Sequence, residues 1–528
     1  MARNYKPEGS PWYNGSVDAD ATAETLRSES FDLVVIGGGI IGTGVAWIAA
    51  RAGLRVALCE RDDLAAWTSS ASSKLIHGGL RYLRMGDVKL VREAHTERRA
   101  LARVVAPHLV RPLRFVMPLR ADGPYGPVLI GAGMVAYGAL SGFRDGPTLV
   151  VAPPRAHALA PALRTDGLRA GGVYHDHQTD DARLVVAVAR AAAACGATIA
   201  TRCEVVSLDV RDGRTSHVEV RSAAGEEITI RTRAVVNATG PWVDSLRRLE
   251  DARAGTSSLL SKGAHLVLET DERWPSAVTV PLDRVRVSFA LPYNGMLVLG
   301  TTDEPYEGDP AGVLPNAADQ ERILAEAGSA LRADVVDPAR VRFRFAGLRA
   351  LPLDNGDTAS TRRESVLSRG PGGMLSVAGG KYTTFRRIAL DVVRALAPEL
   401  GLHALDEHAA PLADAADPDT MAALLCTRPY ALDPELARHL ARLYGAAAPA
   451  VASLALEDAS LLEPLHSASP DIGAQVVWAR HAEWATEVDD VVRRRTSLVF
   501  RGHDDADVRA RVATLLERPM PPAARAAA

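Results

Sequence analysis

The sequence predicts an α/β protein in which a β-α-β unit opens the fold, an antiparallel sheet is inserted, and a helical domain follows. Three observations predict this arrangement. A glycine-rich turn lies between two apolar runs near the start, alternating apolar residues recur through the middle, and helical spacing without strand signals begins near residue 405. A chain of 528 residues should form two or three domains, which excludes a small module.

Composition narrows the class of protein. Hydrophobic residues make up 47% and charged residues 24% of the chain, as in ordinary globular proteins. The net charge of −3 argues against binding to nucleic acid through the overall field. Four cysteines lack metal-ligand spacing, and no apolar signal segment follows Met1. We therefore expect a cytoplasmic protein without a metal site or a disulfide framework.

The first structured element is expected at Phe31. Residues 1–30 are polar, show no sustained period and are predicted to form a mobile arm. Residues 31–36 form a short apolar run that predicts a strand, and small apolar residues at helical spacing predict a helix over 40–52. Residues 54–59 predict a second strand, which closes at Glu60. Together these elements make one β-α-β unit.

Later helices and strands are predicted from the same two patterns, helical spacing and alternation of apolar residues. An alanine-rich helix is predicted at 184–195, and strands are predicted at 198–200, 204–208 and 234–237. Alternation of Val218 and Val220 with Ile228 and Ile230 predicts a hairpin. The domain boundaries expected from this pattern are 31–110, 165–260 and 340–400 for a discontinuous nucleotide domain, 111–164 and 261–339 for a substrate domain, and 405–520 for a helical domain.

The glycine-rich turn carries the first functional signal. Gly37, Gly39 and Gly42 follow a strand and open a helix, as in dinucleotide-binding proteins. Gly37 permits the tight turn, Gly39 lets a pyrophosphate approach the backbone, and Gly42 lets the helix pack closely on the strand. Glu60 ends the next strand 18 residues after Gly42, where it can accept hydrogen bonds from a ribose diol. The turn therefore predicts a nucleotide site.

Distant segments favour FAD over NAD. Further strand-glycine signals arise at 236–240 and 375–380, as if several segments converged on one extended cofactor. The stretch 68–82 has hydroxyls that can bind pyrophosphate and paired glycines that allow close approach to a flat ring. Its candidate cofactor residues are Thr68, Ser69, Ser72, Ser73, Lys74, His77 and Gly78.

Residues 31–120 and several later segments resemble the FAD-dependent glycerol-3-phosphate dehydrogenases. The later segments are Asp-Asp-Ala-Arg-Leu at 180–184, Asn-Ala-Thr-Gly-Pro-Trp at 237–242, Ser-Lys-Gly at 261–263, Gly-Thr-Thr-Asp at 300–303, Gly-Leu-Arg at 347–349 and Gly-Gly-Lys-Tyr-Thr-Thr at 379–384. Arg-Arg-Arg-Thr at 493–496 resembles the C-terminal domain of that family. Ile41, Ala350 and Phe385 depart from its usual residues without changing the class.

The resemblance implies a fold, a cofactor and a reaction. It implies a flavin domain of the glutathione-reductase and D-amino-acid-oxidase type, with an antiparallel substrate domain and a helical C-terminal domain. It also implies non-covalent FAD, oxidation of sn-glycerol 3-phosphate to dihydroxyacetone phosphate, and electron transfer to a membrane quinone. The further cofactor residues that it implies are Val205, Thr239, Gly240, Gly380, Lys381 and Thr383, with Tyr82 beside the substrate.

The implied reaction requires particular side chains, which indicate candidate substrate-binding and catalytic residues. A substrate phosphate needs fixed cations, and Arg81, Arg349 and Arg362 lie in matching motifs. Loss of a hydride from C2 to flavin N5 requires the hydroxyl proton to leave, for which His265 and Lys381 are the candidate base or polarising cation. Only five of the 61 basic residues are lysine, so the lysine in the Gly-Gly-Lys segment indicates a need for a compact ammonium.

A membrane surface is the last expected partner. Arg84, Lys89, Arg92, Arg98, Arg99 and Arg103 lie on a predicted helix that could meet anionic lipid headgroups, which would place the protein at the inner face of the cytoplasmic membrane. Residues 123–143 carry no charge, yet six glycines and two prolines favour a buried or interfacial segment over a membrane span. A solvated basic helix, a homodimer, an oxygen-using oxidase and a non-catalytic flavin-binding sensor remain open.

Overall fold

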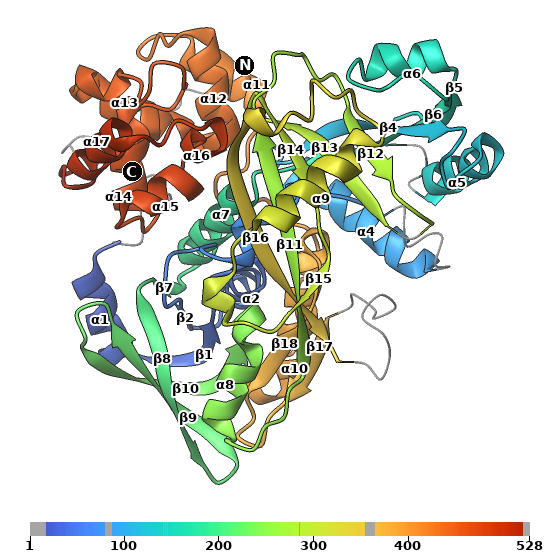
Figure 1. The fold of residues 1–528 in the computed structure, drawn as a ribbon. Helices are drawn as coiled ribbons and strands as arrows, with labels where there is room; N and C mark the ends of the chain where they lie inside the picture. Colours follow the sequence, from blue (N-terminus) through green and yellow to red (C-terminus); the bar gives the residue numbers. More distant parts are fainter. Residues whose placement is uncertain are drawn as a thin grey trace.

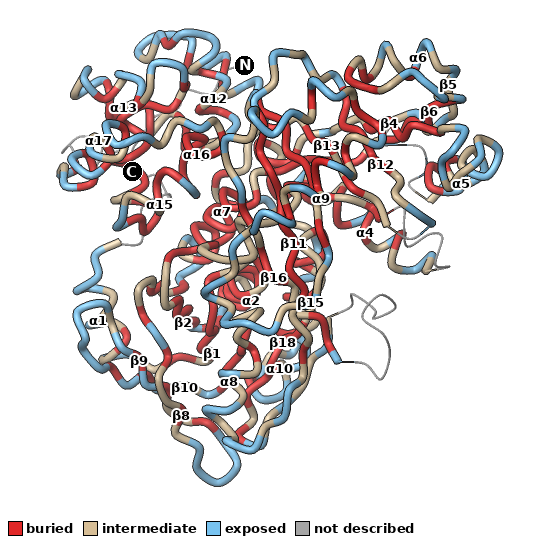
Figure 2. The backbone as a smooth tube through the Cα atoms, in the orientation of Figure 1, coloured by how far each residue is buried: buried red, intermediate tan, exposed pale blue. Residues whose placement is uncertain are grey.

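The computed structural model describes residues 17–79, 87–140, 142, 144, 146–284, 286–353 and 365–520. Within them the chain forms two sheets and a helical domain, which lie in the lower half, the upper right and the upper left of Figure 1. The predicted α/β class is confirmed. Figure 2 shows that buried residues run through both sheets and through helix α7 (Asp181–Ala194).

The first sheet has eight described strands and holds the nucleotide-binding unit. Its main path runs β17-β18-β10-β1-β2-β7, and β9 pairs with both β10 and β8. The bounds are β1 (Ser30–Ile36), β2 (Val56–Cys59), β7 (Thr198–Ala200), β8 (Cys203–Arg211), β9 (Arg214–Ser222), β10 (Glu227–Asn237), β17 (Val366–Arg369) and β18 (Leu375–Ala378). The predicted hairpin is present, because Ile228 pairs with Val220 and Ile230 with Val218.

Helix α2 (Ile40–Arg51) is buried on nearly all sides. It follows β1 and packs against α7 (Asp181–Ala194) and α10 (Phe385–Leu400). Small residues permit this close packing, since a Cβ added at Gly44 would lie 2.9 Å from the Phe385 ring. β1 is parallel to both β2 and β10, so the carboxyl ends of three strands meet beside the glycine turn.

The second sheet has ten described strands and is largely antiparallel. Its main path runs β15-β11-β14-β13-β12-β4-β6-β3, and β16 and β5 pair with β11 and β6. The bounds are β3 (Leu75–Ile76), β4 (Arg111–Arg120), β5 (Leu149–Val151), β6 (Leu168–Gln178), β11 (Ser258–Leu268), β12 (Ala277–Pro281), β13 (Val287–Tyr293), β14 (Met296–Gly300), β15 (Glu304–Tyr306) and β16 (Val341–Pro352). Every residue of β11 pairs with β16, which fixes the register of two site segments.

Three expected boundaries differ from the structure. β6 and β16 pair within the second sheet, although the ranges 165–260 and 340–400 place them in the nucleotide domain. The arm expected over residues 1–30 is wrong at its end, because Ala19–Ser28 form helix α1. Asp18 caps this helix and Leu26 is buried against the first sheet. A single apolar anchor in a polar segment gives too weak a period to be recognised from sequence.

The remaining helices cover the sheets or form the C-terminal domain. Those before residue 400 are α4 (Val88–Ala100), α5 (Pro127–Leu140), α6 (Pro153–Leu159), α8 (Val243–Glu250) and α9 (Ala317–Gly328). The C-terminal domain contains α11 (Pro418–Leu425), α12 (Pro434–Tyr444), α13 (Ala448–Glu457), α14 (Gly473–Ala482), α15 (Val488–Arg494), α16 (Leu498–Arg501) and α17 (Ala506–Leu516). This domain has an apolar core of its own.

Helices α5 and α4 are the two segments that the sequence predicts near a membrane. The uncharged helix α5 leaves Val128, Leu129 and Val135 exposed by 88, 63 and 58%. Of the helices that the structure describes, none is long and apolar enough to cross a bilayer. On α4 the expected lipid-facing position of Arg98 is wrong, because the side chain is buried and forms an ion pair with Asp176.

The other basic residues of this segment differ in position. Lys89, Arg92 and Arg103 are exposed, and Arg99 is partly buried, whereas Arg84 lies outside the described residues. Three exposed cations therefore remain on α4 and on the short π-helix Leu101–Val105 that follows it, fewer than the sequence indicates.

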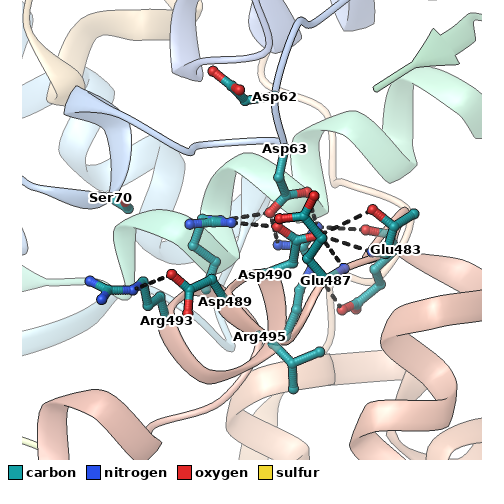
Figure 3. A network of polar contacts seen from close by, with 12 residues as sticks. Asp62, Asp63, Ser70, Glu483, Glu487, Asp489, Asp490, Arg493 and Arg495 are labelled. Atoms are coloured by element: carbon teal, nitrogen blue, oxygen red, sulfur yellow. Dashed lines mark hydrogen bonds and ion pairs between the residues drawn. The ribbon is translucent and has the colours of Figure 1, made fainter. Parts of the chain in front are cut away.

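Buried ion pairs join the helical domain to the first sheet. Asp63, in the loop after β2, accepts hydrogen bonds from Arg494 Nε at 2.6 Å and from Arg495 Nη2 at 2.7 Å (Figure 3). Glu483 binds Arg183 of α7 through both carboxylate oxygens, at 2.6 and 2.8 Å. Burial alone would raise the pKa of Glu483, but Arg183 and then Arg495 hold that pKa below its ordinary value.

Replacing Arg495 should destabilise the protein strongly. Its side chain is fully buried, so Arg495→Met leaves Asp63 with one cation fewer in a dry interface. We expect a loss of about 3 to 5 kcal/mol in the free energy of unfolding, measured by urea denaturation. The neighbouring Arg493 is 43% exposed and pairs with Asp489, so Arg493→Met should cost less than about 1 kcal/mol. Equal midpoint shifts in the two variants would contradict this interpretation.

Candidate functional site

A cavity of about 710 Å³ is lined by both sheets. At one end lie the glycine turn after β1 and the end of β2, and at the other lie β11, β16 and the segment 379–383. The site thus combines parts of the chain that are up to about 350 residues apart, as the interrupted strand-glycine signals predict.

The glycine turn forms an anion-binding helix start. Gly37 has φ +109°, in the region that favours glycine, and a Cβ at Gly42 would overlap the Gly37 carbonyl oxygen. The first N–H group of α2, from Ile40, donates to Ser69 Oγ at 3.0 Å. A Cβ at Gly39 would lie 3.0 Å from that same hydroxyl. The helix start therefore lies on the cavity wall, and a hydroxyl from the serine-rich loop accepts its first N–H group.

Glu60 is held by the backbone at the end of β2. One carboxylate oxygen accepts the Gly38 N–H at 2.6 Å and the other accepts the Asp62 N–H at 2.8 Å. The side chain is buried, and burial raises the pKa of Glu60 to about 7, because it outweighs the two hydrogen bonds that stabilise the charged form. Glu60 consequently titrates near neutral pH when no ligand covers it.

The end of the cavity near Glu60 has an aromatic wall that the sequence does not predict. The Arg61 guanidinium lies 4.0 Å from the centroid of the Trp242 ring, and Trp67 meets the same ring edge to face at 5.0 Å. Leu246 of α8 lines the cavity beside them. These residues come from loops about 180 positions apart, so no local period brings them together, although Trp242 belongs to the 237–242 segment. A flat base can stack on such a wall.

His265 lies at the opposite end, on β11. Its Nε2 is 2.9 Å from Ser73 Oγ, and its ring stacks on Phe345 of β16 at 4.8 Å between centroids. Burial, followed by the charges of Arg349 and Lys74, lowers the pKa of His265 to about 3. The imidazole is therefore neutral at pH 7 and can accept a proton or a hydrogen bond.

Arg349 is brought beside His265 by the register of the two strands. Ser261 pairs with Arg349 and Gly263 with Gly347. A Cβ at Gly263 would lie 2.6 Å from Arg349 Nη2, which explains a glycine at this position. The guanidinium contacts Thr301 Oγ1 at 3.1 Å and is 25% exposed. Its fork is held in place while part of it faces the cavity.

Most predicted site residues line this one cavity. They are Gly37, Gly39, Glu60, Thr68, Ser69, Ser72, Ser73, His77, Val205, Thr239, Gly240, His265, Arg349, Gly380, Lys381 and Thr383. Arg81, Tyr82 and Arg362 lie outside the described residues. In the part of the chain that is described, no group of His, Cys, Asp and Glu could hold a metal ion.

Lys74, Gly42 and Gly78 do not line the cavity. Lys74 is buried behind it, where its ammonium forms an ion pair with Asp181 Oδ1 at 2.6 Å and lies 4.6 Å from the Phe500 ring centroid. Its sequence neighbours Ser72 and Ser73 face the ligand space instead. The structure therefore corrects the expected cofactor contact of Lys74: this lysine anchors the loop.

The residues present fit FAD. Gly37 and Gly39 line the space at a turn where a Cβ would press on the Ala238 backbone or the Ser69 hydroxyl, a helix start faces the space, and Glu60 and an aromatic wall occupy one end. The volume lies within the usual range for ligand pockets of roughly 300 to 1,000 Å³. Lys381, His265 and Arg349 surround the other end, where a redox-active ring and its substrate would meet.

Comparison with known proteins agrees with this geometry. Residues 32–386 match the family described as FAD dependent oxidoreductase, and residues 408–520 match the C-terminal domain of alpha-glycerophosphate oxidase. A glycerol-3-phosphate dehydrogenase from Mycobacterium leprae is 36% identical over 493 residues, which cover 90% of this chain and 82% of the relative. An aerobic glycerol-3-phosphate dehydrogenase from Staphylococcus haemolyticus is 34% identical over 73% of this chain and 70% of its own.

A solved structure matches nearly the whole chain. The glycerol-3-phosphate dehydrogenase from Bacillus halodurans, complexed with FAD, is 28% identical and superimposes with a TM-score of 0.72 over 92% of this chain and 90% of its own. The glycerophosphate oxidase from Mycoplasma pneumoniae shares the fold, with a TM-score of 0.56 and 17% identity. The FAD cofactor expected from sequence is confirmed.

The raised pKa of Glu60 should make FAD binding depend on pH. An ionised carboxylate accepts two hydrogen bonds from a ribose diol better than a protonated one, so the Kd for FAD should fall up to about tenfold between pH 6 and 8. Glu60→Gln should bind FAD more weakly and lose this dependence, as measured by fluorescence titration of the apoprotein. Glu219→Gln on the exposed face of β9 is the control.

Ionisation of Glu60, which should strengthen FAD binding, should lower the stability of the apoprotein. Because the folded-state pKa of Glu60 lies above the ordinary 4.5, the stability of the ligand-free protein should fall as pH rises through about 7. A Kd for FAD that stays constant over this range in the wild type would exclude Glu60 from the ribose site.

Proposed function

The chain belongs to the FAD-dependent glycerol-3-phosphate dehydrogenases, and from this membership we propose that it oxidises sn-glycerol 3-phosphate to dihydroxyacetone phosphate and passes the electrons to a quinone. One observation carries the proposal. His265, Arg349 and Lys381, which come from three separate segments, line the same cavity as the glycine turn and Glu60. A phosphate-binding cation, a neutral base and a compact ammonium are thus gathered at the redox end of a nucleotide site.

Arg349 binds the substrate phosphate. A guanidinium fork binds phosphate through two parallel hydrogen bonds, and Arg349 is oriented for this by Thr301 and Thr302. Its ion pair with Asp303 Oδ1 is long, at 3.3 Å, and partly exposed. That carboxylate therefore leaves the cation able to exchange partners for a dianionic phosphate.

His265 takes the proton from the substrate hydroxyl. Its pKa is lowered by burial and by the cations Arg349 and Lys74, so the ring is neutral before substrate binds. A phosphate dianion beside Arg349 offsets that positive field and raises the proton affinity of the imidazole as the complex forms. The Ser73 hydroxyl, 2.9 Å from Nε2, fixes the ring orientation.

Lys381 supplies positive charge at the same end. FAD, when bound, would accept the hydride from C2 of the substrate, and His265 would take the hydroxyl proton as the C2 carbonyl forms. Lys381 follows Gly379 and Gly380, whose φ values of +75 and +101° bring the backbone close to the cavity wall. An ammonium there stabilises negative charge that develops on substrate oxygen or on the ring, in less space than a guanidinium needs.

The proposed acceptor is a membrane quinone, with the protein attached peripherally to the inner face of the cytoplasmic membrane. The exposed apolar side chains of α5 would enter the headgroup region, and Lys89, Arg92 and Arg103 would meet anionic lipids. Oxygen is the second candidate acceptor, because the C-terminal domain matches a family named after an oxidase.

Anaerobic addition of glycerol 3-phosphate tests the proposal. It should bleach the flavin absorbance, and a water-soluble quinone analogue should restore the absorbance faster than air does. Stoichiometric peroxide during aerated turnover would assign the protein as an oxidase. An unchanged flavin spectrum would favour a non-catalytic flavin-binding sensor.

Arg349→Ala should impair substrate binding much more than cofactor binding. Loss of a charge-assisted contact costs about 1.5 to 3 kcal/mol, or roughly ten- to a hundredfold in KM, with FAD content retained. Arg342, on the same strand, pairs with Glu269 on the surface, so Arg342→Ala should leave KM unchanged. Steady-state kinetics of both holoproteins are the measurement, and a normal KM in Arg349→Ala would remove this residue from the site.

A further inference from the structure

A second cavity, of about 490 Å³, lies where three parts of the chain meet. Its lining comes from β4 and the turn before it, from the start of α7 and the end of β13, and from α12 and α16 of the helical domain. In Figure 1 the orange-red helical domain lies beside α7 at this junction. None of its lining residues belongs to the flavin cavity, so it is a separate space.

Positive charge dominates this lining. It contains the four guanidinium groups of Arg111, Arg438, Arg442 and Arg501 and only two carboxylates, Asp180 and Glu435. Both oxygens of Asp180 are already engaged, since Oδ1 accepts the Arg183 N–H at 3.0 Å and Oδ2 accepts the Tyr293 hydroxyl at 2.8 Å. None of the four guanidinium groups forms an ion pair with a carboxylate among the residues that the structure describes.

Arg111 shows most clearly that a counter-ion is missing. Its Nη2 donates a hydrogen bond to Gln178 Oε1 at 3.3 Å, which is long for a charged donor. Burial, and secondarily the charge of Arg442, lowers the pKa of Arg111. The buried arginines of the described chain, which are at most 8% exposed, all pair with carboxylates; they are Arg98, Arg183, Arg190, Arg386, Arg494 and Arg495. Arg111 is only partly buried, and it has no carboxylate partner among the described residues where it faces the cavity.

His108 gives a second, independent indication of a ligand. It lines the cavity and is only 4% exposed, yet neither of its ring nitrogens has a hydrogen-bond partner within the described part of the chain. Burial lowers the pKa of His108 to about 4, so the ring is neutral at pH 7, with one donor and one acceptor nitrogen. Buried polar groups normally have partners, and a ligand in the cavity would supply them.

We infer that this second cavity binds a phosphorylated metabolite that carries two or more negative charges. Guanidinium groups bind phosphate oxygens in pairs, and four of them exceed what one monoanion can neutralise. The volume is that of an ordinary small-molecule pocket. Such a ligand would replace the counter-ion that Arg111 lacks and would join the helical domain to both sheets.

Pyrophosphate is the probe for the test, with the intact FAD-loaded protein. Calorimetric titration at constant ionic strength should detect binding, and the thermal midpoint should rise because the ligand bridges three parts of the fold. Arg442→Gln, at an exposed position, should weaken that binding at least tenfold while glycerol 3-phosphate turnover without pyrophosphate stays normal. Arg248→Gln, an exposed arginine of α8 outside both cavities, is the matched control and should bind as the wild type does.

Arg349→Ala separates this site from the substrate site. Pyrophosphate binding to the second cavity should persist in Arg349→Ala and be lost in Arg442→Gln. The reverse pattern would show that pyrophosphate binds only where the substrate does, and wild-type affinity in Arg442→Gln or no binding at all would equally overturn the inference. The result is independent of the proposed reaction, because the readout is binding and not turnover.

Discussion

The buried ion pair between Lys74 and Asp181 holds the two ends of the cofactor cavity in register. Asp181 Oδ1 binds the Lys74 ammonium, while Oδ2 accepts both the N–H and the hydroxyl of Ser72. The next side chain, Ser73, contacts His265 on the second sheet. One carboxylate at the start of α7 thus positions the loop that connects the nucleotide end of the cavity with the catalytic end.

The spacing of His265 and Arg349 at the far end depends on strand pairing. His265 and Arg349 lie on β11 and β16, whose pairing runs without a shift from Ser258 to Val267. A slip by one residue would turn both side chains to the opposite face of the sheet. A site built on paired strands is more rigid than one built on loops, which would keep the proposed phosphate-binding cation and the proposed base at a fixed spacing.

Sequence reasoning recovers what local pattern and motif encode. The β1-α2-β2 unit, the β9-β10 hairpin, the FAD cofactor and the helical C-terminal domain follow from period, glycine spacing and resemblance. It fails where the position of a side chain depends on a residue that is distant in the sequence. Lys74 stands among serines that face the cavity, but only the position of Asp181 tells that its ammonium points away. From sequence, Arg98 is indistinguishable from the exposed cations of the same helix. Only the structure shows that it is buried and paired with Asp176 of β6.

The pairing of Asp63 with Arg494 and Arg495 also constrains how the protein is synthesised. These partners are 431 and 432 positions apart, and Asp63 lies three residues after Glu60. At roughly 5 to 20 residues per second a ribosome needs on the order of 20 to 90 s to make that interval. During this time the loop that carries the nucleotide contact has an unpaired carboxylate in place of its final anchor. Until residues 494 and 495 have been made, the loop after β2 therefore lacks the two cations that anchor it in the finished protein.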